Sequence, residues 1–344
     1  MSAQVDTDVQ REILVGSDCS GLGTEFFALN ALGVEYTNCF MSEISENALK
    51  VIRRNHQPQT LYRDITERDD VADMPSVDIY VAGPPCQSHS SLNCKKKQDD
   101  PRSDVYEHCL EYIEAKQPAC FLLENVRGML TTNKGAHWKK FSMHLDTLPY
   151  TWEHAILCPT DYGVPASRPR VWIVGIHKRL NAKCIPWPQK IKLEKTCLDC
   201  IDEDALHSGR PIAPVYMRFL EKWGIPADTR CLIEPNSSSR SYPVYGSKAK
   251  SLTESQRKCV ARTEICPCVV SKDPGIMLPH LKRMASPREV LRLQGFADGT
   301  VNIPPSMTDL QFCSLVGNAF NMAVIRELLR PLLPLLPVVR ASWY

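Results

Sequence analysis

Apolar runs and helix-like segments alternate along the first half of the 344-residue chain. Runs that are apolar on both faces predict buried strands, and segments with helical spacing follow most of them. Such strands occur in parallel sheets, because helices then cover each face. The pattern therefore predicts an α/β fold with a parallel or mostly parallel sheet. The predicted strands are residues 12–17, 36–44, 60–65, 77–83, 119–126, 151–158 and 170–178, and the predicted helices are residues 24–33, 46–56, 104–117 and 135–148.

The fourth apolar run ends abruptly at Pro84, Pro85 and Cys86. Proline fixes its own φ and has no N–H group, so the strand must end there. Cys86 is therefore predicted to sit on a stiff turn at the carboxyl end of a strand, which is the edge where open α/β sheets bind ligands. The alternative is a buried cysteine that merely caps the strand, the commoner fate of a single free cysteine.

The strand and helix pattern stops at about residue 179. Residues 180–282, which we call the basic lobe, are rich in proline, serine and basic residues. Between Lys178 and Arg292 there are 21 Lys and Arg against 12 Asp and Glu, a net charge of +9, whereas the rest of the chain carries −7. A basic segment on a near-neutral body suggests a polyanionic partner, although a solvated surface has the same composition.

Helical spacing returns near the C-terminus, and the chain is expected to have three parts. The predicted late helices are residues 286–296 and 318–329. The expected parts are residues 1–179 as a cofactor-binding and catalytic domain, 180–282 as the basic lobe, and 283–344 as a segment that returns to the first domain.

The 15 cysteines are scattered and odd in number, which favours reduced thiols inside a cell. No apolar run is long enough to span a bilayer, and the polar start of the chain does not resemble a secretory signal. We therefore expect an intracellular protein, nuclear in a eukaryote and cytoplasmic in a bacterial or viral setting. One cysteine group has partial zinc-site spacing, but its second half is too tight, so we predict no metal site. Its members are Cys197, Cys200, Cys259, Cys266 and Cys268.

A glycine turn after the first strand and an acid at the end of the second form a nucleotide-cofactor layout. The turn spans residues 18–23, and the acid is Glu43. Glycine lets a cofactor approach the backbone, and a carboxylate there can bind ribose hydroxyls. The full dinucleotide pattern is missing, so an adenosyl cofactor without a pyrophosphate fits as well.

Three further chemical groups follow at strand ends. Cys86 follows the fourth strand, Glu124 ends the fifth, and Arg168 and Arg170 precede the last. A thiol, a carboxylate and an arginine pair at one sheet edge can attack an electron-poor ring. Taken singly, each has an ordinary structural explanation: a buried cysteine, a capping glutamate and surface arginines.

The ordered set PPCQ, ENV, DYGVPxxRxRVWIVG, SPREVLRLQGF and GNA closely resembles the cytosine-5 DNA methyltransferases across residues 13–330. The stretch DPRSD at 100–104 also resembles the family's DPRG. The resemblance implies a Rossmann-like S-adenosylmethionine-dependent methyltransferase fold, with the basic lobe as a smaller, irregular target-recognition region. The closing helix at 318–329 falls where the family completes the cofactor pocket.

The resemblance also implies a mechanism on double-stranded DNA. The Cys86 thiolate would add to carbon 6 of a flipped cytosine, and carbon 5 would take the methyl of S-adenosylmethionine. Glu124 would contact ring nitrogen 3 and the exocyclic amine. Arg168 would hold the carbonyl oxygen and favour the ionised form of Cys86, and Arg170 is a further catalytic candidate. The cofactor contacts implied are Asp18, Cys19, Gly21, Gly23, Glu43, Ile44, Asp64, Ile65, Pro84, Asn318 and Ala319.

The chain departs from the family pattern at a few positions. Cys19 stands where Phe is usual, Thr24 and Ala166 where Gly and Gln are usual, and Ser88 and His89 where Pro or Gly and then Phe are usual. These departures bear on cofactor affinity and on closure of the loop after Cys86. The residues most needed for the chemistry are kept, which favours an active enzyme.

Other functions stay open from the sequence. The same chemistry on RNA is one, although the Cys-Phe-Thr signature of the tRNA-modifying branch is absent. A catalytically degenerate DNA-binding or regulatory homologue is another. A nicotinamide dehydrogenase would not explain Cys86, Glu124 and Arg168 together. We expect a monomer that acts on DNA without a membrane, and a targeting partner protein is left open.

Overall fold

The computed structural model describes residues 12–68, 70–85, 105–204, 209–233, 253–271 and 275–336, without the side chains of residues 258 and 259. Cys86, Ser88, His89 and the stretch 100–104 lie outside the described residues.

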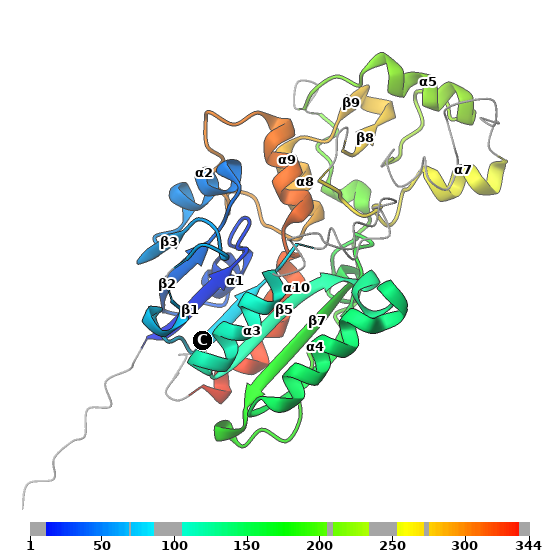
Figure 1. Cartoon of the computed structure of the whole chain (residues 1–344). Coiled ribbons are helices and arrows are strands. Elements are labelled where there is room, and N and C mark those ends of the chain that lie inside the picture. Colours follow the sequence, from blue (N-terminus) through cyan, green and yellow to red (C-terminus); the bar gives the residue numbers. More distant parts are fainter. Residues whose placement is uncertain are drawn as a thin grey trace, which may run out of the picture.

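A seven-stranded sheet forms the centre of the larger part of the molecule, with the order β3-β2-β1-β4-β5-β7-β6 (Figure 1). The first five strands are parallel, and β7 runs antiparallel to β5 and β6. The predicted mostly parallel α/β fold is therefore confirmed. The strands are β1 (Ile13–Asp18), β2 (Tyr36–Ser42), β3 (Thr60–Tyr62), β4 (Ile79–Ala82), β5 (Cys120–Val126), β6 (Tyr150–Leu157) and β7 (Arg170–His177).

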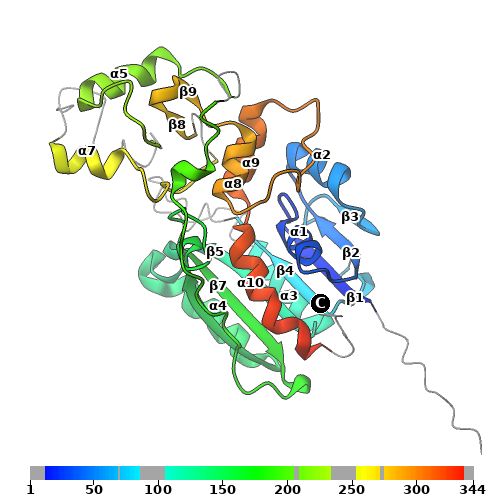
Figure 2. The ribbon, with the colours of Figure 1, turned by 180° about the vertical axis from the view of Figure 1, so that it is seen from behind.

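Helices cover both faces of this sheet, and its central strands are buried on both sides, whereas the edge strands β3 and β6 are partly exposed. Within β4, Ile79 and Val81 belong to one hydrophobic core, and Tyr80 and Ala82 belong to the other. Figure 1 shows α3 and α4 on one face, and the view from behind shows α10 on the opposite face (Figure 2). The helices around the sheet are α1 (Thr24–Ala31), α2 (Glu46–Asn55), α3 (Val105–Lys116), α4 (Ala136–Thr147), α8 (Pro287–Leu293), α9 (Asp309–Asn318) and α10 (Met322–Leu332). Short 3-10 turns are η1 (Val71–Asp73), η3 (Arg127–Leu130), η4 (Thr132–Gly135), η5 (Pro159–Asp161), η6 (Lys178–Leu180), η7 (Cys197–Cys200), η8 (Pro279–Leu281) and η9 (Leu333–Leu335).

The basic lobe has few regular elements, as expected, but it contains a helix that the sequence pattern missed. This is α5 (Pro214–Trp223), which begins with a proline and is followed by Gly224 at φ 65. Both are ordinary helix-end signals. The helix buries Phe219 and Trp223 in a separate small core. The other elements there are α7 (Glu254–Val260), which was also not predicted, and β8 (Met277–Leu278), which pairs with β9 (Arg283–Met284) directly after the lobe. The boundaries of the lobe stay a prediction.

The last predicted helix is wrong at its start. Asn318 ends α9, and α10 begins only at Met322. Asn321 separates them, because its side chain accepts the N–H groups of Ala323 and Val324 as an N-cap. Among the described residues, no single helix is long and apolar enough to cross a membrane, and α9 with the segment to residue 335 meets that test only as a pair bent by 41°.

Candidate active site

The strand order changes direction between β1 and β4, and the predicted site residues gather at the carboxyl ends of these strands. From β1 the chain moves outward to β2 and β3, and from β4 it moves to the other side. Such a switch point leaves an opening at the sheet edge, where α/β proteins bind ligands. Since β7 is antiparallel to β5, the first residue of β7 meets the end of β5 at this edge.

Glu124 and Arg170 form an ion pair at this edge. The Arg170 Nε lies 3.2 Å from the Glu124 Oε1, and the two side chains are 18% and 13% exposed. Burial raises the pKa of Glu124 above the usual range of a carboxyl, and the charges of Arg170 and then Arg168 offset part of that rise. A nearly buried carboxyl beside one guanidinium can stabilise charge that develops on a ligand.

Arg168 has different oxygen atoms as hydrogen-bond partners from Arg170. Its side chain is buried, with Nη1 donating to the Val269 carbonyl at 2.8 Å and Nη2 to the Ala319 carbonyl at 2.9 Å. These bonds tie the loop before β7 to the basic lobe and to the junction of α9 and α10. The sequence predicted a base contact for Arg168, but the structure places Arg170 against Glu124.

Asn125 connects Glu124 to the turn that precedes Cys86. Its side-chain amide donates to the Pro84 carbonyl at 3.0 Å, and its Oδ1 accepts the Val126 N–H at 2.8 Å. The ENV motif is visible in the sequence, but this role of Asn125 was not predicted from it. The sequence signal for this role was an asparagine directly after a glutamate at the end of a predicted strand. The bond fixes the beginning of the turn next to the Glu124 strand.

The glycine turn and Glu43 meet as the cofactor layout predicted. The Gly21 N–H donates to Glu43 Oε2 at 2.8 Å, and the Ser45 N–H donates to Oε1 at 2.7 Å. Gly21 and Gly23 have φ values of 55 and 69, a conformation that favours glycine. A Cβ at Gly21 would meet no atom within 4 Å, so the turn leaves open space beside the carboxylate.

The remaining predicted cofactor contacts differ in their exposure and in their partners. Ile44 is 65% exposed, which is unusual for a large apolar side chain beside a buried strand end. Asp64 Oδ1 accepts from the N–H and the Oγ1 of Thr66, both at 2.8 Å. Asn318 is exposed, whereas Ile65, Pro84 and Ala319 are buried. An exposed apolar face beside a carboxylate fits an adenosyl group, because the base needs an apolar surface and the ribose needs acceptors.

Asp18 serves the core of the protein. Its carboxylate is fully buried and accepts from Arg68 at 2.6 Å, from the Tyr80 hydroxyl at 2.7 Å and from the Ser42 hydroxyl. The predicted cofactor contact therefore cannot come from its side chain. The neighbouring Cys19 adopts a φ of 52, and burial raises the pKa of its thiol well above the ordinary value.

The cysteines with partial zinc spacing do not assemble into a metal site in the part of the chain that the structure describes. Cys197, Cys200 and Cys266 are buried, and the Cys259 side chain is not described. Among the described residues, no three His, Cys, Asp or Glu side chains could hold a metal ion together. Cys268 instead accepts hydrogen bonds from Arg168 and Arg170.

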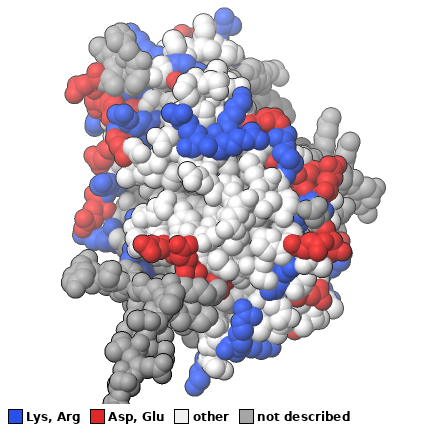
Figure 3. Space-filling model, turned by 90° about the vertical axis from the view of Figure 1, so that its left-hand side faces the viewer, with Lys and Arg blue, Asp and Glu red and all other residues white. Residues whose placement is uncertain are grey.

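Basic side chains also gather outside the basic lobe. On the face seen in Figure 3, Lys and Arg form a band above a broad uncharged area. Helix α2, which lies on that side of the molecule in Figure 1, carries the exposed Lys50, Arg53 and Arg54. We call these three residues the α2 basic surface.

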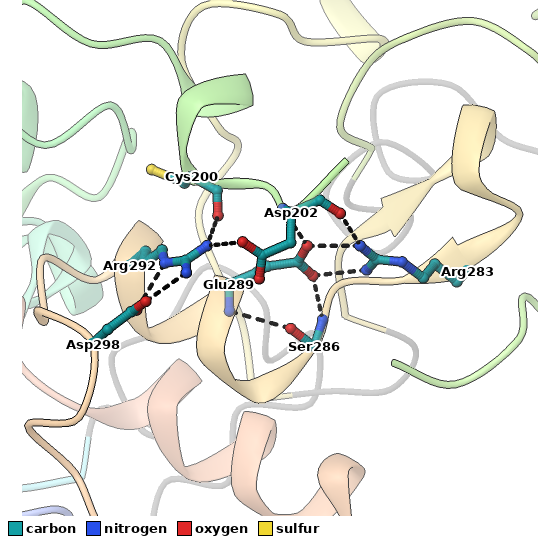
Figure 4. A network of polar contacts seen from close by, with 7 residues as sticks. All are labelled: Cys200, Asp202, Arg283, Ser286, Glu289, Arg292 and Asp298. Carbon is teal, nitrogen blue, oxygen red and sulfur yellow. Dashed lines mark hydrogen bonds and ion pairs between the residues drawn. The ribbon is translucent and has the colours of Figure 1, made fainter. Parts of the chain in front are cut away.

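A buried polar cluster fastens the basic lobe to α8 (Figure 4). Glu289 is fully buried and receives both Nη groups of Arg283 at 2.7 Å, together with the N–H groups of Ser286 and Asp202. Arg292 binds the Asp202 carboxylate at 2.6 Å. Asp202 lies within the basic lobe, and Arg283 directly follows its last residue. Two segments far apart in the sequence are therefore bonded to one helix.

Comparisons with known proteins agree with this geometry. The family model of C-5 cytosine-specific DNA methylases matches residues 17–333. Type II methyltransferase M1.ScrFI of Lactococcus lactis subsp. cremoris is 29% identical over 300 residues, 86% of this chain and 72% of that one. Type II methyltransferase M.NgoBI of Neisseria gonorrhoeae is 27% identical over 89% of this chain and 90% of its own.

Solved structures share the fold. A protein encoded within an E. coli prophage, named as a DNA modification methyltransferase, has a TM-score of 0.66 and 20% identity, with 94% of this chain and 99% of that chain covered. A DNMT2 mutant of Spodoptera frugiperda has a TM-score of 0.63 and 21% identity, over 94% and 100% of the two chains.

Proposed function

The chain belongs to the C-5 cytosine-specific DNA methylase family, and we propose that it is an S-adenosylmethionine-dependent DNA (cytosine-5-)-methyltransferase. The observation that carries the proposal is the Glu124–Arg170 ion pair, which stands at the sheet edge beside the turn that leads to Cys86. A family match over nearly the whole chain supports the same conclusion.

The residues take the following roles in the proposed reaction. The Cys86 thiolate adds to carbon 6 of a cytosine flipped out of the duplex, which makes carbon 5 nucleophilic. Glu124 contacts ring nitrogen 3 and the exocyclic amine, where charge develops as the adduct forms. S-Adenosylmethionine, when bound, supplies the electrophilic methyl group that carbon 5 takes up. Loss of the carbon 5 proton then returns an electron pair to the ring and releases the Cys86 sulfur.

We assign the contact with the carbonyl oxygen of the base to Arg170. Its guanidinium lies beside Glu124, whereas the carbonyl groups of Val269 and Ala319 hold the guanidinium of Arg168. We assign a structural role to Arg168, because it joins the loop before β7 to the basic lobe and to the junction of α9 and α10.

The cofactor site is proposed at the turn Gly21–Gly23, Glu43 and Ile44. Glu43 is held by two backbone N–H groups and so presents its oxygens in a fixed direction. The exposed Ile44 offers an apolar surface for the base. Asp64 follows β3 and Asn318 is the last residue of α9, and both are proposed as further contacts.

Double-stranded DNA is the proposed substrate, with the basic lobe as the recognition region. The charge of +9 between Lys178 and Arg292 supports a polyanion there. We propose a monomer as the working form.

Two measurements test the function. Labelled S-adenosylmethionine should transfer its methyl group to mixed DNA, with RNA as the comparison. With S-adenosylmethionine present, DNA that contains 5-fluorocytosine should become covalently joined to the wild-type protein, because fluorine leaves no carbon 5 proton to lose after methyl transfer and so blocks release of the Cys86 sulfur. Cys86→Ser should yield no adduct, since a serine hydroxyl is barely ionised at neutral pH. Folded wild-type protein that binds cofactor and DNA without transfer or adduct would contradict the proposal.

A further inference from the structure

Arg168 and Arg170 share a neighbour that the proposed reaction does not use, the thiol of Cys268. Its Sγ accepts from Arg168 Nη1 at 3.7 Å and from Arg170 Nη2 at 3.8 Å. The two guanidinium groups carry like charges close together, and burial and then the charge of Arg170 lower the pKa of Arg168. A shared acceptor between them offsets part of that repulsion.

The segment that carries Cys268 is bonded on one side to the loop before β7. The Cys266 N–H donates to the Pro165 carbonyl at 2.8 Å, and the Ser167 N–H donates to the Cys266 carbonyl at 2.9 Å. The Val269 carbonyl then accepts from Arg168. Backbone bonds on either side of Cys268 therefore set where its sulfur lies.

The same segment packs against α9 on its other side. A Cβ on Gly317 would lie 2.4 Å from the carbonyl carbon of Val270, so only glycine allows this approach. The Ser314 hydroxyl donates to the Ser271 carbonyl at 2.7 Å. Cys268 thus belongs to a strip of the basic lobe that is held between the β7 loop and α9.

The guanidinium of Arg170 has at least three contacts with described residues. Its Nε pairs with Glu124 at 3.2 Å, its Nη1 donates to the Pro169 carbonyl at 3.0 Å, and its Nη2 donates to Cys268. Because a guanidinium is planar, anchoring its far end sets the plane and the direction of Nε. Of these three partners, Cys268 is the one that the basic lobe contributes.

We propose that Cys268 is a positioning residue that fixes the Arg170 guanidinium against Glu124, so that the geometry of the catalytic pair depends on the seating of the basic lobe. The consequence for the reaction rests on the function proposed above, whereas the contact itself does not. Small displacements of such groups cost rate more than binding, because they matter where charge develops.

The direct test titrates Glu124 without any substrate. The side-chain carboxyl of Glu124 is followed by carbon-13 NMR and identified by the signal that Glu124→Gln removes. In Cys268→Ala the pKa of Glu124 should rise, because Arg170 is the charge that lowers it most. Cys268→Ser should restore part of the wild-type pKa, since its hydroxyl still accepts hydrogen bonds.

Cys231→Ala is the matched control, because Cys231 is a buried cysteine in the separate core of the basic lobe. It should leave the titration of Glu124 unchanged. An unchanged titration in Cys268→Ala, an equal shift in Cys231→Ala, or a serine variant no different from alanine would each overturn the proposal.

Turnover supplies the second readout. Cys268→Ala should lower the single-turnover methylation rate by about tenfold, with dissociation constants for DNA and S-adenosylhomocysteine nearly unchanged. A wild-type rate would contradict the positioning role. A wild-type protein without any methyl transfer, combined with the expected Glu124 titration, would refute the proposed function and leave the positioning role supported.

Discussion

Glu124 and Glu43 are carboxylates at the same sheet edge, but their partners suit them to different tasks. Glu43 accepts two backbone N–H groups, from Gly21 and Ser45, and is therefore held in one orientation. Glu124 faces the side chain of Arg170, whose charge can act on a ligand as well. Burial raises the pKa of both groups. We therefore propose that Glu43 orients a ligand and that Glu124 stabilises charge on one.

Glu124→Gln should retain DNA binding and lose most turnover. The carboxylate acts on charge that grows only in the adduct, so its loss should lower kcat by about 10²-fold or more and leave the DNA dissociation constant nearly constant. Single-turnover methylation and equilibrium DNA binding check this prediction. Near wild-type turnover would remove Glu124 from the chemistry.

Glu25 should make the stability of the protein depend on pH. It is fully buried in α1, its oxygens have no hydrogen-bond partner among the described residues, and burial raises its pKa from 4.5 to about 7. A raised carboxyl pKa means that the folded state binds the proton more tightly. The contribution of Glu25 to the free energy of unfolding is therefore fully present below about pH 4.5. It is lost as the pH rises through about 7.

Glu25→Gln should remove this loss of stability at higher pH. The stability advantage of the variant over the wild type should grow by about 3 kcal/mol between pH 4.5 and pH 7.5, as measured by urea unfolding at several pH values. The exposed Glu35 provides the control, and Glu35→Gln should show no such trend. A constant difference between Glu25→Gln and wild type across this range would rule out the buried, titrating carboxyl.

At the scale of elements, the sequence pattern predicted the features that depend on residues close together in the chain. All seven strands of the central sheet were predicted, because most of them are buried and appear in the sequence as apolar runs. The short strands β8 and β9 and the helices α5, α7 and α9 were not predicted. The start of α10 was not, because Ala319 and Phe320 are apolar and continue the helical spacing, while the cap at Asn321 interrupts it. The burial of Arg168 could not be predicted, since its partners Val269 and Ala319 lie 101 and 151 residues further along the chain.

The cluster on α8 predicts a specific pattern of stability. Arg283→Met or Glu289→Leu alone should each destabilise the protein by about 3–5 kcal/mol, because each leaves one buried charge without its partner. The double variant should be less destabilised than either single variant, since no charge is then buried. Chemical denaturation of the four proteins checks this. Additive losses in the double variant would contradict a buried ion pair.

At the scale of the whole molecule, two basic regions compete as the DNA-binding surface. The basic lobe and its borders carry a net +9, whereas the α2 basic surface lies on the larger part of the molecule (Figure 1). Sheet topology places the Glu124–Arg170 pair at the switch-point edge, and the strip around Cys268 brings the lobe to that pair. Under the proposed function, we expect a duplex that delivers a cytosine to Glu124 to lie against the lobe.

Removing charge from the basic lobe should flatten the salt dependence of DNA binding. Each phosphate that the protein neutralises releases counterions, so the slope of log K against log salt should shrink by about 0.9 for each phosphate that is no longer bound. The lobe variant replaces the exposed Lys192, Lys195 and Arg218 with glutamine. The matched control replaces the three residues of the α2 basic surface in the same way and should keep the wild-type slope. Fluorescence anisotropy over a range of salt concentrations measures both. If the control loses slope and the lobe variant does not, the duplex runs over α2, and the recognition role of the basic lobe is wrong.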